Sequence, residues 1–206
     1  MQVSYQPTQI TPAIYRGSNP CRSAATTGNL NQSESAVLQH LKKAKFTHIV
    51  CLLEPGNNKA IPHYAANKFN VVPFPIPDFG VPNATDLALL IDKMIEIAKN
   101  PQNKVLVHCQ GGFGRTGMVV ASYLTATTGC SGDQAIAKVR RLVPHSVETR
   151  NQEKLVNTIA STFASRIRCA RHIKRLETQI ASAGSGKRAR AVKQSLIMQR
   201  NEYLKV

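Results

Sequence analysis

The stretch KVLVHCQGGFGRTGMVVASYL, residues 104–124, joins a strand-like run, a glycine-rich loop and the start of an apolar helix. Gly112, Gly114 and Gly117 have the G-x-G-x-x-G spacing of dinucleotide-binding loops. That fingerprint expects an acidic residue at the end of the following strand, about twenty residues on, whereas Asp133 stands at a predicted helix start. The triphosphate-binding pattern also fails, because it needs a lysine that this loop lacks. The sequence therefore disfavours both cofactor-binding interpretations, and we expect no cofactor.

A cysteine and an arginine frame this loop, with five residues between them. In α/β folds, ligands bind at the carboxyl ends of the strands, so we expect Cys109 at the mouth of the sheet. Backbone N–H groups of the loop and the positive end of the following helix dipole form an anion nest. The guanidinium of Arg115 can grip two oxygens of a phosphate in that nest. We expect the phosphate-binding residues to be Gln110, Gly111, Gly112, Phe113, Gly114 and Arg115.

The same environment favours a nucleophilic role for the cysteine. A thiol at a helix N-terminus has a pKa of about 3.5–7.5 instead of about 8.5, so we expect Cys109 to be a thiolate at neutral pH. Its attack on phosphorus would give a covalent phosphocysteine. We expect no metal, because the nest and Arg115 neutralise the charge that Mg²⁺ neutralises in kinases. The alternative is a structural cysteine buried in the core.

The leaving group needs a proton, and a positioned carboxylic acid contributes roughly 10²–10⁴ in rate. The segment NVVPFPIPDFGVPNATD, residues 70–86, contains a strand, a loop shaped by prolines and a glycine, and the start of a helix. Asp78 in this loop is the preferred acid. Asp86 is the rival, although stabilisation by the helix dipole explains an acidic residue in a first turn. Glu54 is a third candidate.

The phosphocysteine must then be hydrolysed. We expect Asp78, deprotonated after the first step, to activate water as a base. Thr116 is expected to donate a hydrogen bond to the departing thiolate. Gln152 either orients that water or serves only in a capping box with Thr149. His108 either sets the loop that follows it by hydrogen bonding, which we favour, or is an ordinary buried strand residue.

Apolar segments typical of β-strands alternate with helical patterns along the chain. The expected strands are 13–18, 47–53, 70–76 and 104–108. The expected helices are 33–44, 84–99, 115–128, one that opens with a capping box at Ser131 and Gln134, one from about 150, and 191–204. This alternation predicts an α/β fold with a central, mostly parallel sheet flanked by helices on both faces.

The composition favours an anionic ligand or partner. The formal net charge is +16 over 206 residues, and such a field attracts phosphorylated substrates, acidic proteins, nucleic acid or anionic membranes. Five cysteines without a C-x-x-C pair argue against a disulfide framework and against a zinc module. The first ten residues lack the features of a signal peptide, and no apolar run is long enough to span a membrane. We therefore expect a soluble, cytoplasmic protein.

Beyond about residue 160 the chain becomes strongly basic, with eleven lysines and arginines against two glutamates. We expect a catalytic domain over residues 1–165 and a basic helical C-terminal extension over residues 166–206. The extension has the pattern of an amphipathic helix with a basic face, a break at GSGKRAR and a short terminal helix. It either docks to an acidic protein, an anionic membrane or nucleic acid, or packs on the catalytic domain with its charges solvated.

These residues resemble the cysteine-dependent protein phosphatases, and among them the small atypical dual-specificity type with its kinase-associated and cell-cycle members. VHCQGGFGRTG, residues 107–117, matches the HC-x₅-R-[ST] signature, and PIPDFGVP, residues 75–82, is similar to the general-acid loop. PHSVETRNQEKLV, residues 144–156, is similar to the segment after the signature helix, and IYRGSNP with LKKAKFTHIVCLLE to the opening strand and helix. The resemblance covers about residues 8–165.

The resemblance implies hydrolysis of phosphomonoesters by Cys109, Arg115 and Asp78, with Thr116 assisting. The length of the chain, and the lack of a counterpart to a phosphotyrosine-recognition loop, favour a shallow pocket. Such a pocket takes phosphoserine and phosphothreonine beside phosphotyrosine, so a phosphorylated protein is the expected substrate.

Two other functions stay open. One is a phosphatase for a non-protein phosphate, either a phosphoinositide or an RNA 5′-phosphate. Phosphoinositide phosphatases carry lysines where this loop has Gln110, Gly111 and Phe113, and the relatives that act on RNA usually carry His and Asn within the loop, which makes these substrates less expected. The other is an inactive phosphate-binding module, which is disfavoured because the cysteine, the arginine and the acid are all present.

Overall fold

The computed structural model describes residues 4–184 and 186–203. The chain forms two compact units, which divide after Ala160. The first unit contains the sheet and the glycine-rich loop, and the second contains the basic extension. The domain boundary expected after residue 165 stays a prediction.

The first unit is built on a five-stranded sheet with the order β1-β2-β5-β3-β4. Its strands are β1 (Thr8–Gln9), β2 (Ile14–Gly17), β3 (His48–Cys51), β4 (Asn70–Pro73) and β5 (Val105–His108). The neighbours β2, β5, β3 and β4 are parallel, whereas β1 pairs antiparallel with β2. The predicted mostly parallel sheet is therefore confirmed.

The register of the central strands decides where the glycine-rich loop begins. His108, the last residue of β5, lies opposite Gly17 of β2 and Cys51 of β3. The whole of β5 is buried, as expected of a central parallel strand covered on both faces. Cys109 therefore follows at the carboxyl edge of the sheet, where open α/β folds bind their ligands.

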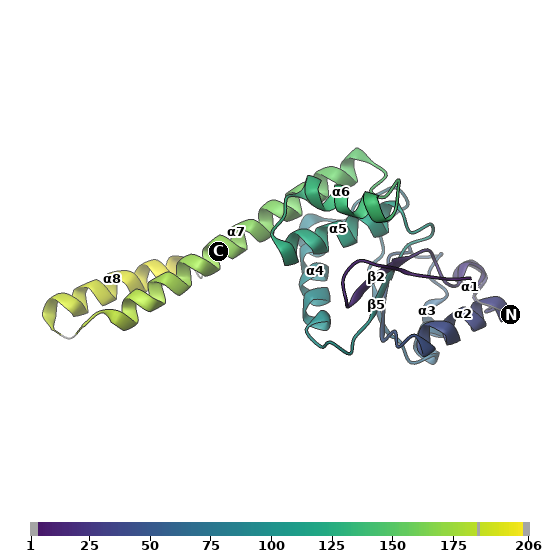
Figure 1. Ribbon diagram of the computed structural model, residues 1–206, viewed down its shortest axis with the longest axis horizontal. Coiled ribbons are helices and arrows are strands. Elements are labelled where there is room, and N and C mark those ends of the chain that lie inside the picture. The colour runs from purple at the N-terminus through teal and green to yellow at the C-terminus, as the bar shows by residue number, and fades with distance from the viewer. Residues whose placement is uncertain (1–3, 185, 204–206) are drawn as a thin grey trace. The chain divides into compact units, whose positions relative to one another are not determined.

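Helices cover both faces of this sheet, as the alternating pattern predicts. They are α1 (Arg22–Thr27), α2 (Gln32–Lys43), α3 (Ile61–Ala66), α4 (Ala84–Ala98), α5 (Gly114–Thr128) and α6 (Gly132–Leu142). Figure 1 shows α4, α5 and α6 on one side of the sheet and α1, α2 and α3 on the other. The helix α5 is buried from Gly114 to Thr125, so the helix that follows the loop is the most enclosed in the unit.

Local signals explain most of the helix boundaries. The Ser131–Gln134 capping box predicted from the sequence is present at the start of α6. A second box, between Asn31 and Glu34, starts α2. The helices α1 and α3 and the strand β1 were not predicted. The strand β1 has two residues and, among the described strands, pairs only with the edge of β2. The helices α1 and α3 have six residues each, so their formation depends on packing against the sheet more than on helix propensity.

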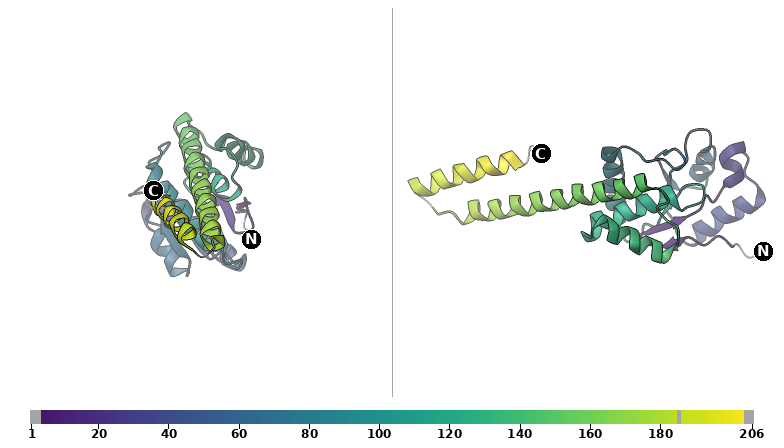
Figure 2. Two further views of the ribbon diagram at one scale, coloured as in Figure 1. Left: turned by 90° about the vertical axis from the view of Figure 1, so that its left-hand side faces the viewer. Right: turned by 90° about the horizontal axis from the view of Figure 1, so that it is seen from above.

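The helix α7 (Arg150–Ser182) begins in the first unit, and α8 (Lys187–Tyr203) follows after a short break (Figure 2). The expected helical extension is thus present, with α8 starting four residues earlier than the predicted 191. In the described part of the chain, no helix is both long enough and apolar enough to cross a bilayer.

Glu34 ties the starts of two helices together. Its Oε1 accepts hydrogen bonds from the backbone N–H groups of Ser23 and Ala24 in α1, at 2.5 and 3.4 Å. Its Oε2 accepts from the Asn31 N–H at 3.2 Å. The carboxylate is buried, so it compensates helix-terminal N–H groups that would otherwise lack partners.

We expect Glu34→Ala to lower the free energy of unfolding by about 2 kcal/mol, because it removes charge-assisted hydrogen bonds at two helix starts. Denaturant-induced unfolding measures this change. The control is Glu96→Ala, which removes an exposed ion pair with Lys99 and should cost at most about 0.5 kcal/mol. Equal losses in the two variants would contradict the assignment.

Candidate active site

The segment from the end of β5 into the first turn of α5, residues 109–115, is called the phosphate loop below. Cys109 is 3% exposed, and the backbone N–H of Gly112 donates a hydrogen bond to its Sγ at 3.2 Å. No side chain caps the start of α5, so the positive end of that helix is free to stabilise a negative charge. The arrangement suits an anionic sulfur and an anionic ligand.

Gly112 is the residue that lets this loop close. Its φ of 85° is in the left-handed region, which glycine adopts without a Cβ clash. A Cβ at this position would lie 2.5 Å from the carbonyl oxygen of Gly17. The carbonyl of Gly112 in turn accepts a hydrogen bond from the guanidinium of Arg16. The end of β2 thus fixes the middle of the phosphate loop.

Arg115 joins the phosphate loop to the loop that carries the expected acid. Its Nη1 donates to the Ile76 carbonyl at 3.0 Å, and its Nη2 lies 2.6 Å from Oδ1 of Asp78. The arginine side chain is 5% exposed and the aspartate side chain 59% exposed. The structure therefore brings Asp78 to the phosphate loop while leaving its carboxylate open to an approaching substrate.

The rival acids lie elsewhere. Asp86 is in the first turn of α4, whose N-cap is Asn83. Glu54 accepts a hydrogen bond from the side chain of Asn57. Among the described residues, the only carboxylate that forms an ion pair with Arg115 is that of Asp78. The role of Asp78 as the acid stays a prediction.

Thr116 and His108 are buried on either side of the phosphate loop. Within the described part of the chain, the Thr116 hydroxyl has no hydrogen-bond partner. His108 Nδ1 lies 3.1 Å from the Cys109 carbonyl. Because a carbonyl only accepts, the imidazole carries its proton on Nδ1. Burial lowers the pKa of His108 to about 4; the hydrogen bond to the Cys109 carbonyl opposes this shift and the charge of Arg115 adds to it.

Gln152 lies where three parts of the site meet. Its Oε1 accepts from the Glu148 and Thr149 N–H groups at 2.9 and 3.4 Å, and its own N–H donates to the Thr149 hydroxyl. This is the reciprocal pattern of a capping box. Its Nε2 also donates to the Gly80 carbonyl in the acid loop, at 3.4 Å. A Cβ on Gly114 would lie 3.1 Å from the Gln152 amide, so Gln152 is beside the start of α5.

Asn19 was missed at the sequence level. Its backbone N–H and its Nδ2 donate to the backbone and side-chain oxygens of Gln110, both at 3.0 Å. Its Oδ1 accepts from the Cys21 N–H at 2.9 Å and from the Tyr64 hydroxyl at 3.3 Å. Asn19 therefore binds the phosphate loop to the segment that follows β2. In the sequence, the N-P dipeptide that begins with Asn19 indicates only a turn. Nothing in the sequence indicates that Asn19 binds Gln110.

Two further cysteines, Cys21 and Cys51, are buried in the core. All five cysteines of the chain are unpaired. Cys51 is 1% exposed in the core between the sheet and α1, α2 and α3. Burial raises its pKa to about 11. Burial also raises the pKa of Cys21, to about 12. Both thiols are thus protonated at neutral pH and serve as small apolar core residues.

Residues 28–156 match the family model described as Swiss Army Knife protein, DSP-PTPase phosphatase domain. The chain belongs to this family of cysteine-dependent phosphatases. The membership expected from the HC-x₅-R signature is therefore confirmed.

No group of three or more His, Cys, Asp or Glu side chains in residues 4–184 and 186–203 could hold a metal ion.

Individual relatives agree with the DSP-PTPase assignment. The zebrafish Protein tyrosine phosphatase domain-containing protein 1 is 39% identical over 83 residues, 40% of this chain and 11% of that protein. The human Dual specificity protein phosphatase CDC14C is 28% identical over 136 residues, 66% of this chain and 29% of that protein. The chain thus spans less than a third of either. The crystal structure of Tk-PTP in its active form has a TM-score of 0.63 and 25% identity, covering 75% of this chain and 96% of Tk-PTP.

We expect the neutral, buried His108 to make this phosphatase domain acid-sensitive. An unfolded histidine titrates near 6.5, whereas the folded one has a pKa of about 4. The unfolded state therefore binds the extra proton first, and stability falls as pH drops from about 6.5 to about 4, by up to ~3 kcal/mol. Urea unfolding across this range should show a shallower pH dependence for His108→Gln than for the wild type.

The imidazole can also be followed directly in the wild type by NMR, which does not depend on the variant folding. A His108 titration midpoint near 6.5, or parallel stability curves for the two proteins, would contradict the burial argument.

Proposed function

We propose that this protein is a metal-independent phosphomonoester hydrolase that works through a phosphocysteine. Its expected substrates are proteins carrying phosphotyrosine and phosphoserine or phosphothreonine. One observation carries the proposal: the guanidinium of Arg115 contacts Asp78 directly, at the end of the loop that begins with Cys109. The Arg115 side chain thus connects the loop that carries the nucleophile, Cys109, to the acid, Asp78. Its guanidinium is the group proposed to bind the phosphate.

In the first step, Sγ of Cys109 attacks phosphorus. The bond between phosphorus and the ester oxygen breaks, and its electron pair goes to that oxygen. Asp78 in its acid form supplies the proton for the leaving group. The phosphate oxygens are held by the N–H groups of the phosphate loop, by the start of α5 and by the Arg115 fork. Because Asp78 is paired with Arg115 before substrate arrives, the phosphate replaces the carboxylate on the guanidinium.

In the second step, water attacks the phosphocysteine and the bond between phosphorus and sulfur breaks. Asp78, now a carboxylate, takes the proton of the water. The electron pair returns to sulfur, and the buried Thr116 hydroxyl donates a hydrogen bond to that thiolate. Gln152, beside the start of α5, orients the water. Its capping role would be preserved throughout, since that role uses Oε1 and the attacking water can use Nε2.

Cys109→Ser should abolish turnover of para-nitrophenyl phosphate in EDTA, because a hydroxyl at neutral pH is a far weaker nucleophile than a thiolate. Asp78→Ala should lower kcat by roughly 10²–10⁴, as expected for the loss of a general acid. Asp86→Ala is the matched control, and we expect it to keep wild-type turnover.

Full activity of the serine variant, or a requirement for added metal, would refute the mechanism. To test the substrate class, phosphopeptides are compared with phosphoinositides and 5′-phosphorylated RNA. Turnover of only the lipid or only the RNA would favour the alternative function.

We also propose a function for the basic extension: it is a docking segment that binds an anionic partner. In α7, Arg168, Arg171 and Arg175 recur at helical spacing and are exposed. This face can attract an acidic protein, an anionic membrane or nucleic acid. The competing interpretation, solvated charges on a packed helix, predicts no such binding.

Replacing Arg168, Arg171 and Arg175 by Gln should lower the salt concentration at which the full chain elutes from heparin, while turnover of para-nitrophenyl phosphate stays unchanged. The control replaces three exposed lysines of the first unit by Gln, and it removes the same charge. The control lysines are Lys42, Lys43 and Lys138. Equal shifts for both proteins would mean that only net charge matters. Phosphatidylserine vesicles, polyglutamate and single-stranded RNA then identify the class of partner.

A further inference from the structure

The loop between α6 and α7, residues 143–149, packs against the start of α5. The Val147 N–H donates to the Phe113 carbonyl at 3.3 Å. A Cβ on Gly117 would lie 2.8 Å from the Val147 nitrogen and 3.0 Å from the Cβ of Ser146, so the two segments are in close contact. This loop, which we call the α6–α7 loop, therefore reaches the phosphate loop on which the scissile phosphate is proposed to bind.

Arg140 of α6 holds the α6–α7 loop in place. Its Nε donates to the Ser146 carbonyl at 2.9 Å, and its Nη2 donates to the Val147 carbonyl at 2.8 Å. Its Nη2 also lies 2.6 Å from Oε1 of Glu153 in α7. One guanidinium thus connects the loop to the helices before and after it, so the residues of the loop have fixed positions.

Val147 has a backbone conformation that a β-branched residue rarely adopts. Its φ of 60° is in the left-handed region, where a branched side chain is crowded. The side chain is 1% exposed, so packing holds it there. Residues held in such conformations cluster at active sites. The turn at Val147 brings the next residue, Glu148, to the first turn of α5.

The carboxylate of Glu148 lies beside Gly114, the first residue of α5. A Cβ on Gly114 would overlap Oε2 of Glu148 and would lie 3.1 Å from both Nε2 and Oε1 of Gln152. The two side chains therefore meet next to the phosphate loop, where the positive end of the α5 dipole favours a negative charge. Glu148 is exposed and belongs to none of the ion pairs among the described residues. Its carboxylate can thus accept a hydrogen bond from a water molecule.

Gln152 connects this carboxylate to the acid loop. Its Nε2 donates to the Gly80 carbonyl at 3.4 Å. Asp78, two residues earlier in the same loop, contacts Arg115. Asp78, Gln152 and Glu148 therefore all border the space between the acid loop and the start of α5.

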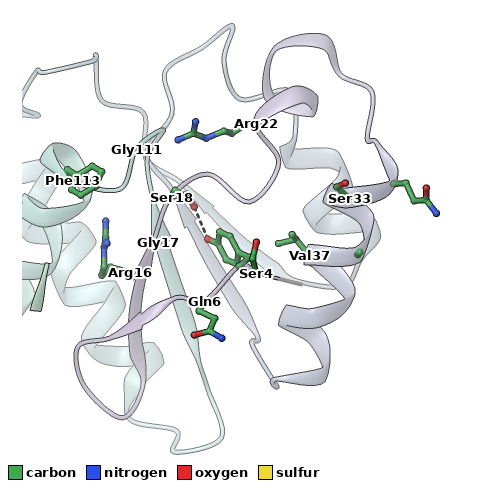
Figure 3. Close-up of a pocket in the computed structure, with 13 residues that line it drawn as sticks. Ser4, Gln6, Arg16, Gly17, Ser18, Arg22, Ser33, Val37, Gly111 and Phe113 are labelled. Atoms are coloured by element: carbon green, nitrogen blue, oxygen red, sulfur yellow. Dashed lines mark hydrogen bonds between the residues drawn. The ribbon is translucent and has the colours of Figure 1, made fainter. Parts of the chain in front are cut away.

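The larger groove beside the phosphate loop does not involve these three side chains. It has a volume of about 1070 Å³ and opens next to Gly111 and Phe113, between the end of β2 and the starts of α1 and α2 (Figure 3). Its described lining residues include neither Asp78 nor Gln152 nor Glu148. A substrate can therefore extend into the groove without displacing the Glu148 carboxylate.

The water that hydrolyses the phosphocysteine needs a partner for each of its two hydrogens. A water molecule held in a protein typically makes about three hydrogen bonds. In the proposed second step, Asp78 takes one hydrogen and Gln152 donates to the oxygen, which leaves the second hydrogen without an acceptor. A carboxylate oxygen such as Oε2 of Glu148 supplies that acceptor.

We propose that Glu148 is a further catalytic residue, whose carboxylate accepts a hydrogen bond from the attacking water. The inference rests on the proposed phosphatase function and deepens its second step. One proton of the water passes to Asp78, the water oxygen bonds to phosphorus, and the electron pair of the phosphorus–sulfur bond returns to Sγ of Cys109. The second proton stays on the transferred oxygen and is held by Glu148.

An alcohol tests this role, because it attacks the phosphocysteine with a single hydroxyl hydrogen. Ethylene glycol added to the assay competes with water, and its one hydrogen goes to Asp78. Its attack therefore needs no hydrogen bond to Glu148. The ratio of glycol phosphate to inorganic phosphate, measured for the full chain with para-nitrophenyl phosphate as substrate, reports on the second step alone.

Two variants of similar side-chain length separate the hydrogen bond from the bulk of the side chain. Glu148→Met has no acceptor oxygen, and we expect it to raise the ratio of glycol phosphate to inorganic phosphate by about tenfold or more, as for the loss of one charge-assisted hydrogen bond. Glu148→Gln keeps an acceptor oxygen and should raise the ratio by only about threefold. The control Glu96→Gln removes the same charge from an exposed position in α4 and should keep the wild-type ratio.

Steady-state constants give a second readout. The leaving group departs before water attacks, so kcat/KM does not report on hydrolysis of the phosphocysteine. We expect kcat/KM of Glu148→Met to stay within about twofold of the wild-type value. An unchanged product ratio in Glu148→Met, equal ratios in the Met and Gln variants, or a fall in kcat/KM as large as the rise in the ratio would overturn the role of Glu148.

The same assays separate this role from the proposed function. If the wild type does not hydrolyse para-nitrophenyl phosphate, or if Cys109→Ser keeps its activity, the proposed function fails and the role of Glu148 fails with it. If the wild type is active, Cys109→Ser is inactive and Glu148→Met keeps the wild-type product ratio, only the role of Glu148 fails.

Discussion

The contact between Arg115 and Asp78 is the interaction on which the site depends. A guanidinium that is 5% exposed needs partners, because an unpaired buried cation is costly. This arginine finds one in the Ile76 carbonyl and another in the Asp78 carboxylate. Two loops that leave the same sheet edge are thereby held against each other. The same fork is the obvious ligand for a phosphate dianion, so the structural contact and the proposed chemistry use the same atoms.

A second arginine supports the phosphate loop from its other side. Arg16 donates to the Gly112 carbonyl, while Asn19 holds the backbone and side chain of Gln110. The loop N–H groups can converge on an anion because its carbonyls find donors outside the nest. The elements that supply these donors, β2 and the start of α1, also line a groove beside the phosphate loop.

Much of the fold follows from local signals. The apolar runs near 49, 72 and 106 are strands, and the capping box at Ser131 starts a helix where expected. The short helices α1 and α3 could not be predicted, because six residues do not form a stable helix without packing. The loop residues Cys109 and Arg115 were predicted from their spacing, which is a local property. Asn19 and Arg16 act through contacts more than ninety residues away in sequence, and no pattern in one sequence reveals such a pairing.

The sequence by itself determined that this protein has a parallel α/β sheet, a C-x₅-R loop between a strand and a helix, and a basic helical extension. Each of these features depends on residues that are close together in the sequence. It can therefore be predicted from hydrophobic periodicity and from the spacing of residues. Only the tertiary structure decided that Asp78, rather than Asp86 or Glu54, meets Arg115. It also decided that a buried guanidinium faces a groove beside the phosphate loop. Both depend on which loops the sheet register brings to one edge, and register is a long-range consequence of burying the strands together.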